Sequence, residues 1–243
     1  MTGSDVVVHS GGDLLAAAAA ARLITKLVDA QAARGLASLV LTGGRTGNAV
    51  MEHVRDSPAR EAVDWSRVDF YWGDERFLPA GHADRNETQA RAALLDHIYV
   101  DPARVHVMEP SDGRFGDDPD AAALAYAEVL GTPVPSFDVL LLGVGEEGHT
   151  ASIFPDSPAV HEVDRTVVAV RDCPKPPPTR VSLTLPAIRR AQEVWLMTTG
   201  EAKADPVARA LAGASEVEIP AAGARGVQRT LWLLDSSAAA KLS

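Results

Sequence analysis

Short apolar runs alternate with longer amphipathic stretches along this chain, and this alternation constrains its fold more than any other feature. Most of the runs carry apolar residues at successive positions, which is typical of strands buried on both faces. The runs expected to form strands are residues 5–9, 36–42, 68–72, 105–107, 137–142, 167–170, 181–185, 194–199 and 230–234. Strands of this kind, separated by helices, predict an α/β fold with a mostly parallel sheet flanked by helices on both faces.

Helices are expected in most of the intervals between these strands. Their ranges are about 14–33, 47–54, 84–98, 118–130 and 203–211. Asp13 is placed to cap the first helix, and Gly35 to end it. The chain shows no internal repeat and no linker, and its proline-rich stretch 174–178 is short enough to be a rigid loop. We therefore expect residues 1–243 to form a single α/β domain.

Charge and composition narrow the class of partner. The formal net charge of −10 argues against nucleic-acid binding, because no basic field is available to release phosphate counterions. A small anionic substrate stays open, since a few basic residues in a cleft can outweigh a distant acidic surface. The alanine run 16–21 is too short to span a membrane, and residues 1–13 lack the features of a secretory signal. The single cysteine, Cys173, fits a reducing cytosol, so we expect a cytoplasmic protein.

A glycine-rich segment, Thr42–Gly47, joins a predicted strand to a predicted helix. Gly43 and Gly44 allow close approach of the backbone, and the amides at a helix start can bind an anion together with Arg45 and Thr46. The plainer interpretation is a tight turn. No Walker lysine follows, so the segment is not a nucleotide P-loop.

A second glycine segment, residues 143–148, matches the dinucleotide fingerprint G-x-G-x-x-G formally. Pro155 and Pro158 leave barely two turns for the helix that this fingerprint requires. The glycines instead favour a sharp turn that exposes His149 beside Glu147. An imidazole titrates near pH 6.5, so His149 can take a proton from water at neutral pH. The alternative is a histidine that only satisfies hydrogen bonds in its loop.

Charged residues follow other predicted strands, and ligands of parallel sheets bind at the carboxyl ends of the strands. Arg76 could bind a phosphate or carboxylate in bidentate fashion, and Asp74 could orient a sugar hydroxyl. Lys203 falls in the first turn of a predicted helix, where a cation opposes the helix dipole unless an anion is bound. Arg180 follows the stiff proline loop. Taken one at a time, such residues are more often surface ion pairs or solvated side chains.

Other chemistries lack their motifs. The sequence has no G-x-S-x-G segment and no H-E-x-x-H segment, which argues against a serine hydrolase and a zinc peptidase. Cys173 has no cysteine partner for a zinc site. His82 and Asp84 are expected in a solvated loop rather than at a metal, so we expect no metal site.

Six segments, taken in order, resemble the family of 6-phosphogluconolactonases and glucosamine-6-phosphate deaminases, and the resemblance runs over nearly the whole chain. The segments are LTGGRTG (41–47), WGDERFLP (72–79), DRNETQARAALL (84–95), GVGEEGHTASIFP (143–155), PPPTRVSLTLP (176–186) and TGEAKADPV (199–207). The resemblance implies a single Rossmann-like α/β domain. It also implies hydrolysis of 6-phosphogluconolactone to 6-phosphogluconate in the pentose phosphate pathway, without metal or organic cofactor, by a monomer or small homo-oligomer.

By position, His149 resembles the catalytic histidine of the family, and Arg76 and Lys203 resemble its phosphate- or substrate-binding residues. Further positions match the family pattern: Gly43, Gly44, Asp74, Asn86 and Arg180. We expect His149, Glu147 and Asp74 to form the catalytic set.

The chain departs from the family pattern at three places. The usual Ser-Thr-Pro after the double glycine is here 45–47 (Arg-Thr-Gly), Glu147 replaces an aspartate, and Arg85 replaces a serine. The deaminase branch resembles this chain less, because it carries a carboxylate five residues after the histidine, where this chain has Phe154. A sugar-phosphate-binding regulator is a third alternative, and it would be expected to carry a DNA-binding module for which 243 residues leave no room.

Overall fold

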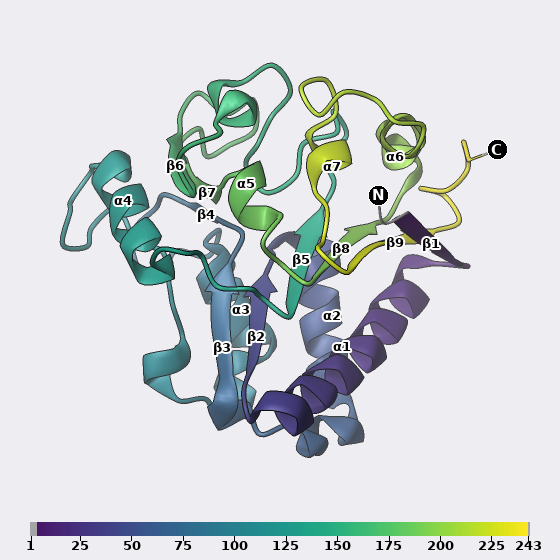
Figure 1. Ribbon diagram of the computed structural model, residues 1–243, viewed down its shortest axis with the longest axis horizontal. Coiled ribbons are helices and arrows are strands. Elements are labelled where there is room, and N and C mark those ends of the chain that lie inside the picture. Colours follow the sequence, from purple (N-terminus) through teal and green to yellow (C-terminus); the bar gives the residue numbers. More distant parts are fainter. Residues whose placement is uncertain (1–3, 243) are drawn as a thin grey trace.

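The computed structural model describes residues 4–242, so the ends of the predicted domain, 1–3 and 243, lie outside the described residues (Figure 1). Six strands form a parallel sheet in the order β1-β9-β8-β5-β2-β3. In that order they span Ser4–His9, Arg229–Asp235, Glu193–Thr198, Val139–Gly143, Ala37–Leu41 and Val68–Trp72. Five of these runs are largely buried between the helical layers, whereas the edge strand β1 is mostly exposed, and the predicted parallel α/β sheet is confirmed.

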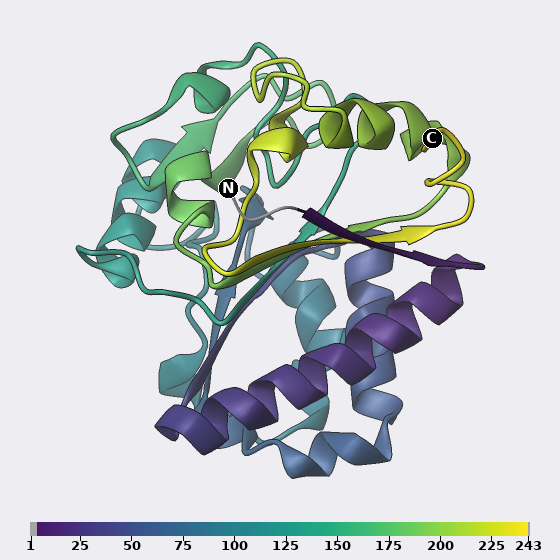
Figure 2. The ribbon, with the colours of Figure 1, turned by 45° about the vertical axis from the view of Figure 1, so that its right-hand side comes forward.

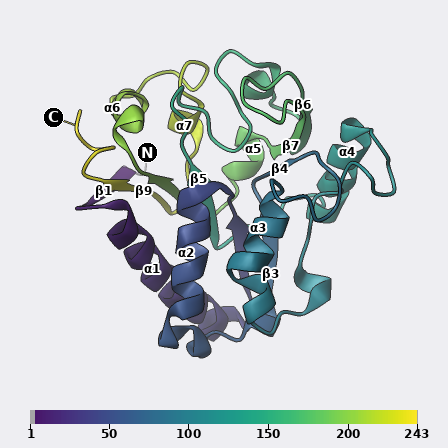
Figure 3. The ribbon, with the colours of Figure 1, turned by 180° about the vertical axis from the view of Figure 1, so that it is seen from behind.

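Helices cover both faces of the sheet (Figures 2 and 3). One face carries α1 (Gly12–Arg34), α2 (Gly44–Asp56) and α3 (Asn86–Ala93). The opposite side carries α4 (Pro119–Leu130), α5 (Leu185–Ile188), α6 (Ala204–Leu211) and α7 (Pro220–Gly223). Short 3-10 turns connect these elements at Pro58–Ala62, Trp65–Arg67, Leu95–His97, Pro102–Arg104, Pro158–His161 and Glu201–Lys203. No helix within residues 4–242 is long and apolar enough to cross a membrane.

A second, three-stranded antiparallel sheet lies beside the main one, in the order β4-β7-β6. Its strands are β4 (Asp74–Arg76), β7 (Arg180–Leu183) and β6 (Val167–Val170). Strands were expected at β6 and β7, whereas 74–76 were expected to be part of the loop that follows the strand 68–72; the structure shows a strand there instead. Asp74 pairs with Ser182 and Arg76 with Arg180, so β4 becomes a strand through pairing with residues far along the chain.

Several predicted boundaries are corrected by local contacts. The helix expected over 84–98 is shorter, because the Glu75 carboxylate accepts the backbone N–H of Asn86 at 2.6 Å and α3 begins there. The strand expected at 105–107 reduces to a single bridge between Phe70 and Val105. Asp13 does not cap α1: Gly11 holds the cap position, and the Asp13 carboxylate instead contacts His53 Nε2 at 3.0 Å.

The ends of two helices also differ from expectation, while a third agrees. The helix after the glycine segment begins at Gly44, three residues earlier than expected, and the one expected from Lys203 has a 3-10 turn before α6 begins at Ala204. Gly35 ends α1 as predicted, with a φ of 78° that favours glycine.

The hydrophobic core lies between the sheet and its two helical layers. Leu39, Phe70 and Leu141, from three neighbouring strands, are buried completely or nearly so. Burying a side chain of this size stabilises the fold by about 1.5–3 kcal/mol relative to leaving it exposed. The packed strands therefore give the loops at their carboxyl ends a rigid base.

Candidate active site

A cavity of about 150 Å³ opens at the carboxyl ends of the central strands, where parallel sheets bind ligands. It is lined by Thr42, Gly43, Gly44, Asp74, Arg76, Asn86, Gly143, Val144, Gly145, His149, Ala151, Arg180 and Lys203. Most residues singled out in the sequence therefore meet here, although they come from six separate segments. Arg45 and Thr46 line an adjoining cavity of about 180 Å³, which shares Lys203 and the glycine pair with the first. Glu147 lines neither cavity and lies behind His149.

The turn that presents His149 depends on two glycines. The Gly145 N–H donates to the His149 carbonyl at 2.8 Å, and Gly148 has a φ of 86°. A Cβ on Gly145 would stand 1.9 Å from His149 Nδ1, so only glycine fits at that position. Residues 149–157 form turns and one bridge rather than a helix. The dinucleotide interpretation of residues 143–148 is thus excluded, as the prolines predicted.

His149 and Glu147 form a close pair. Nδ1 of His149 lies 3.1 Å from Oε2 of Glu147, although the N–H is not well aligned with that oxygen. The imidazole beside it, and secondarily Lys175, holds the pKa of the Glu147 carboxyl well below its usual range, so the carboxylate is ionised at neutral pH. A carboxylate at Nδ1 favours the tautomer that carries its proton there, which leaves Nε2 free to accept a proton.

Phe154 forms the apolar wall beside this pair. Its ring centroid lies 4.4 Å from that of His149, and the Arg180 guanidinium lies 5.8 Å from the Phe154 centroid on the ring face. The His149 side chain is only 15% exposed. A packed neighbour and limited exposure restrict the imidazole to few orientations.

Asp74 occupies a buried polar corner of the cavity. Its Oδ2 accepts the hydroxyl hydrogen of Ser152 at 2.6 Å, and its backbone carbonyl accepts Nδ2 of Asn86 at 2.8 Å. Among the described residues, Asn86 Oδ1 has no hydrogen-bond partner although it is buried. A Cβ on Gly43 would stand 1.8 Å from that oxygen, so the first glycine of the pair is required by Asn86. Sequence reasoning missed Ser152, since a lone small hydroxyl residue gives no signal until the fold places it.

Glu75 fixes the segment that carries Arg76 and Asn86. Its buried carboxylate accepts three backbone N–H groups, at 2.6–2.8 Å, from Arg76, Asn86 and Glu87. Burial raises the pKa of Glu75 to about 7, although Arg85 and these amides favour the charged form. Glu75 therefore fastens β4 to the start of α3.

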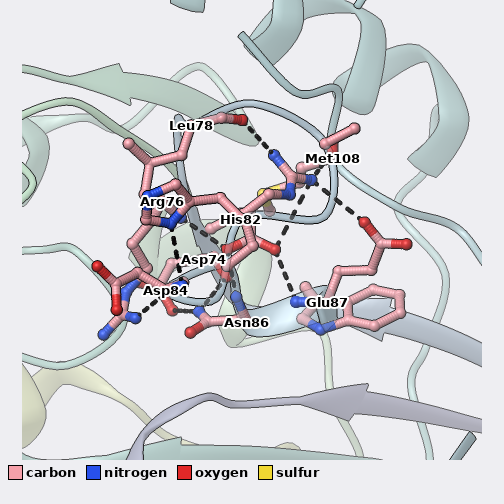
Figure 4. A network of polar contacts seen from close by, with 12 residues as sticks. Asp74, Arg76, Leu78, His82, Asp84, Asn86, Glu87 and Met108 are labelled. Atoms are coloured by element: carbon pink, nitrogen blue, oxygen red, sulfur yellow. Dashed lines mark hydrogen bonds and ion pairs between the residues drawn. The ribbon is translucent and has the colours of Figure 1, made fainter. Parts of the chain in front are cut away.

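Arg85, which replaces the serine of the family pattern, completes this network. Figure 4 shows the network with Leu78, Asn86, Glu87 and Met108 labelled. The Arg85 guanidinium is fully buried, donates to the carbonyls of Met108 at 2.7 Å and Leu78 at 3.2 Å, and lies 3.8 Å from Glu75. Sequence reasoning gave Arg85 no role, because a buried arginine cannot be distinguished from an exposed one by pattern alone.

Cationic side chains approach the cavity from several directions. Arg76 donates to the Asp84 carbonyl at 2.6 Å, and Lys203 donates to the Val144 carbonyl at 2.8 Å. Burial, and then the nearby Lys175 ammonium, lowers the pKa of Lys203. With the buried Arg180, the lining holds three cations against one carboxylate, although the chain as a whole carries −10. Such a lining suits an anionic ligand.

The two glycine-loop side chains differ in exposure. Arg45 is exposed, whereas Thr46 is half-buried and its Oγ1 lies 3.1 Å from Thr199 Oγ1.

His82 and Asp84 are exposed, and the Asp84 N–H donates to His82 Nδ1 at 3.1 Å within their own loop. Within residues 4–242, no three histidine, cysteine or acidic side chains are grouped as a metal ion requires.

Comparisons with known proteins agree on one family. A family model described as glucosamine-6-phosphate isomerases/6-phosphogluconolactonase matches residues 11–232. A protein of Streptomyces coelicolor named 6-phosphogluconolactonase is 61% identical over 98% of this chain and 94% of its own length. The protein of that name from Mycobacterium tuberculosis is 53% identical over 98% of both chains.

Solved structures share the fold. The 6-phosphogluconolactonase of Trypanosoma brucei superposes with a TM-score of 0.84 at 28% identity, covering 100% of both chains. A monomeric glucosamine-6-phosphate deaminase superposes with a TM-score of 0.81 at 19% identity, covering 97% of this chain and 99% of its own. At that identity the second likeness concerns the fold alone.

Proposed function

This chain belongs to the glucosamine-6-phosphate isomerase/6-phosphogluconolactonase family, and we propose that it hydrolyses 6-phosphogluconolactone to 6-phosphogluconate, in the oxidative branch of the pentose phosphate pathway. The observation that carries the proposal is the His149–Glu147 pair at 3.1 Å, held at the edge of a cavity lined by cations. A base next to an anion-binding cavity suits a phosphorylated ester. The names of relatives 61% and 53% identical support the same reaction.

His149 is the proposed general base. Its Nε2 takes a proton from water while the water oxygen attacks the lactone carbonyl carbon. The resulting oxyanion is stabilised by cationic side chains and backbone N–H groups at the cavity. His149 then returns the proton to the ring oxygen as the carbon–oxygen bond breaks, and the carboxylic acid formed loses its own proton to water.

Glu147 and Asp74 are proposed to support this step. Glu147 holds the Nδ1–H tautomer and stabilises the imidazolium that forms during attack. Asp74, anchored by Ser152, is placed to orient a sugar hydroxyl.

The phosphate is proposed to bind where the cations and the glycine loop meet. Lys203 and Arg76 supply charge, and the amides of the loop at the start of α2 supply N–H donors. Binding of the phosphate, which is remote from the reacting bond, holds the lactone carbonyl next to His149. The binding energy of the phosphate therefore contributes to the rate of hydrolysis. The remaining proposed contacts are Gly43, Gly44, Arg45, Thr46, Asn86 and Arg180.

The test is to generate 6-phosphogluconolactone in situ and to measure its disappearance above the uncatalysed rate. We expect acceleration by the wild-type chain and a loss of at least about 10²-fold in His149→Ala. His161→Ala serves as the matched control, because His161 is exposed and lies outside the cavity. Full turnover by His149→Ala would refute the base, and no acceleration by folded wild-type protein would refute the function.

Glucosamine-6-phosphate is the informative second substrate. Phe154 packs against His149 where the deaminase branch is expected to carry a carboxylate, and a phenyl ring cannot move protons. We therefore expect no ammonia release. Ammonia release in the absence of lactone hydrolysis would assign the chain to the deaminase branch instead.

We further propose that residues 1–243 act as one domain, as a monomer or small homo-oligomer. The hydrophobic core draws on strands from both ends of the described chain, which supports one folding unit. Cys173 is buried and unpaired, which fits the reducing cytoplasm that we propose as the compartment.

A further inference from the structure

Lys175 contacts the pair formed by His149 and Glu147, although the sequence gave no reason to single out this lysine. Its Nζ donates to Oε2 of Glu147 at 3.1 Å, and the same oxygen lies 3.1 Å from Nδ1 of His149. One carboxylate oxygen is thus shared by an ammonium and an imidazole. The Lys175 ammonium nitrogen and His149 Nδ1 are therefore separated by at most two hydrogen-bond lengths.

The loop that carries Lys175 is held firmly from behind. The buried Arg180 guanidinium donates through Nη2 to the carbonyl of Lys175 at 3.0 Å and through Nε to the carbonyl of Pro177 at 3.2 Å. Consecutive prolines at 176–178 restrict the backbone further. The Lys175 side chain is 40% exposed, but its backbone is fixed, so the ammonium reaches Glu147 from a rigid support.

The charge balance around the pair gives this contact a consequence. Glu147 alone favours the protonated imidazole, because an anion stabilises the cationic ring. An ammonium on the same oxygen offsets that effect. Other charged groups nearby are Glu146 and Arg45, which act on the Lys203 ammonium as Glu147 and Lys175 do, and Arg180, which lies 5.8 Å from the Phe154 ring centroid. Lys175 contacts Glu147 directly, whereas none of these groups does so among the described residues.

We propose that Lys175 is a positioning residue for the reaction proposed above: its ammonium shares the Glu147 carboxylate with His149, keeps the imidazole aimed and offsets the negative charge beside the ring. The proposal rests on the proposed function for its kinetic part only. Its structural part, the coupling of Lys175 to His149 through Glu147, is a property of the free protein.

The coupling is tested by following the imidazole of His149 in isotope-labelled protein by NMR across pH, with His149→Ala identifying the signal. At this separation one charge moves the pKa of an imidazole by about one unit. Lys175→Met should therefore raise the pKa of His149 by about one unit, whereas Lys175→Arg should stay near wild type. Lys241→Met removes the same charge from an exposed pair with Asp205 and is expected to leave the titration unchanged.

The kinetic consequence follows from the same shift. The acid limb of kcat/KM reports the base in the free enzyme, so it should move up by the same amount in Lys175→Met. A shift of about one unit lowers activity by up to about tenfold on the acid side of this limb, and activity returns to the wild-type value on its alkaline side. The uncatalysed rate is subtracted at each pH. Any titration of the substrate is common to wild type and variant, so it cancels in their comparison.

Three outcomes decide the proposal. An unchanged His149 titration in Lys175→Met overturns it, and so does a rise in KM with an unmoved acid limb, which would make Lys175 a substrate-binding residue. A shift that shrinks by more than half in a Glu147→Gln background supports it, since Lys175 then acts through Glu147. An NMR shift in a chain that hydrolyses no lactone would retain the coupling and refute the proposed function, so the two failures are distinguishable.

Discussion

Gly145→Ala is the substitution for which the geometry predicts the largest functional effect from the smallest chemical change. The added Cβ would stand 1.9 Å from His149 Nδ1 and 2.8 Å from Glu147 Oε2. Ordinary contact begins at 3.4 Å, so the imidazole must move by about 1.5 Å to admit a methyl group. The backbone at Gly145 lies outside the left-handed region, so alanine adds no strain there.

The magnitude follows from what this displacement does to a general base. Moving a catalytic group by about 1 Å can cost about 10²-fold in rate, equivalent to about 2.7 kcal/mol in the transition state. We expect kcat of Gly145→Ala to fall by at least that factor. The fold should lose only about 1 kcal/mol, because the displaced group is one side chain at the cavity edge, and Tm should fall by about 2–4 °C.

Lactone hydrolysis and thermal unfolding, measured on the same samples, check both values. Gly11→Ala is the matched control, since a Cβ on Gly11 meets nothing within 4 Å. In a His149→Ala background the methyl group has no imidazole to displace, so Gly145→Ala should cost less than about threefold there. A full 10²-fold loss that persists without the imidazole would refute the steric reasoning, as would wild-type turnover in the single variant.

Other changes test the supports of the site and one carboxylate outside it. Gly43→Ala places a Cβ 1.8 Å from Asn86 Oδ1, and should lower the free energy of unfolding by about 2 kcal/mol in urea titrations. Arg85→Met removes a fully buried cation beside Glu75, and should cost about 3 kcal/mol in the same assay; a loss below about 1 kcal/mol would contradict the buried pair. Backbone N–H donors lower the pKa of Glu162 to about 2 from 4.5. The stability that its charge contributes is therefore complete above pH 4.5 and is lost as the pH falls to about 2, so Glu162→Gln should have a lower Tm than wild type at pH 6 and an equal Tm at pH 2.

The parallel sheet was predictable because its strands are recognisable from their own residues. The run 68–72 agrees with β3 residue for residue, since all of its residues but Asp69 are apolar and buried. The run 167–170 agrees equally well with β6, which belongs to the antiparallel sheet. Strand β4 was not predictable, because its three residues are charged and its pairing partner lies more than a hundred residues away. The start of α3 escaped prediction for a similar reason: the group that caps it, Glu75, belongs to another element.

The residues that line the cavity directly after a strand could be predicted from the sequence. Parallel strands bring their carboxyl ends to one edge, so polar residues that follow several strands must meet there. Contacts made by loop residues were not predictable. Ser152 and Lys175 carry no pattern in the sequence, and their positions depend on turns whose geometry involves Gly148 and the proline loop.

Three contacts around His149 have separate parts in the proposed reaction, which explains why a lysine and a phenyl ring accompany a carboxylate. Glu147 contacts Nδ1, the Phe154 ring packs against the imidazole, and Lys175 shares the Glu147 oxygen that faces Nδ1. A carboxylate at Nδ1 favours the tautomer that leaves Nε2 free, and the packed ring restricts the imidazole to few orientations. Under the proposal above, the Lys175 ammonium holds the same carboxylate in place, so that the tautomer and the orientation are maintained together, as a general base for water requires.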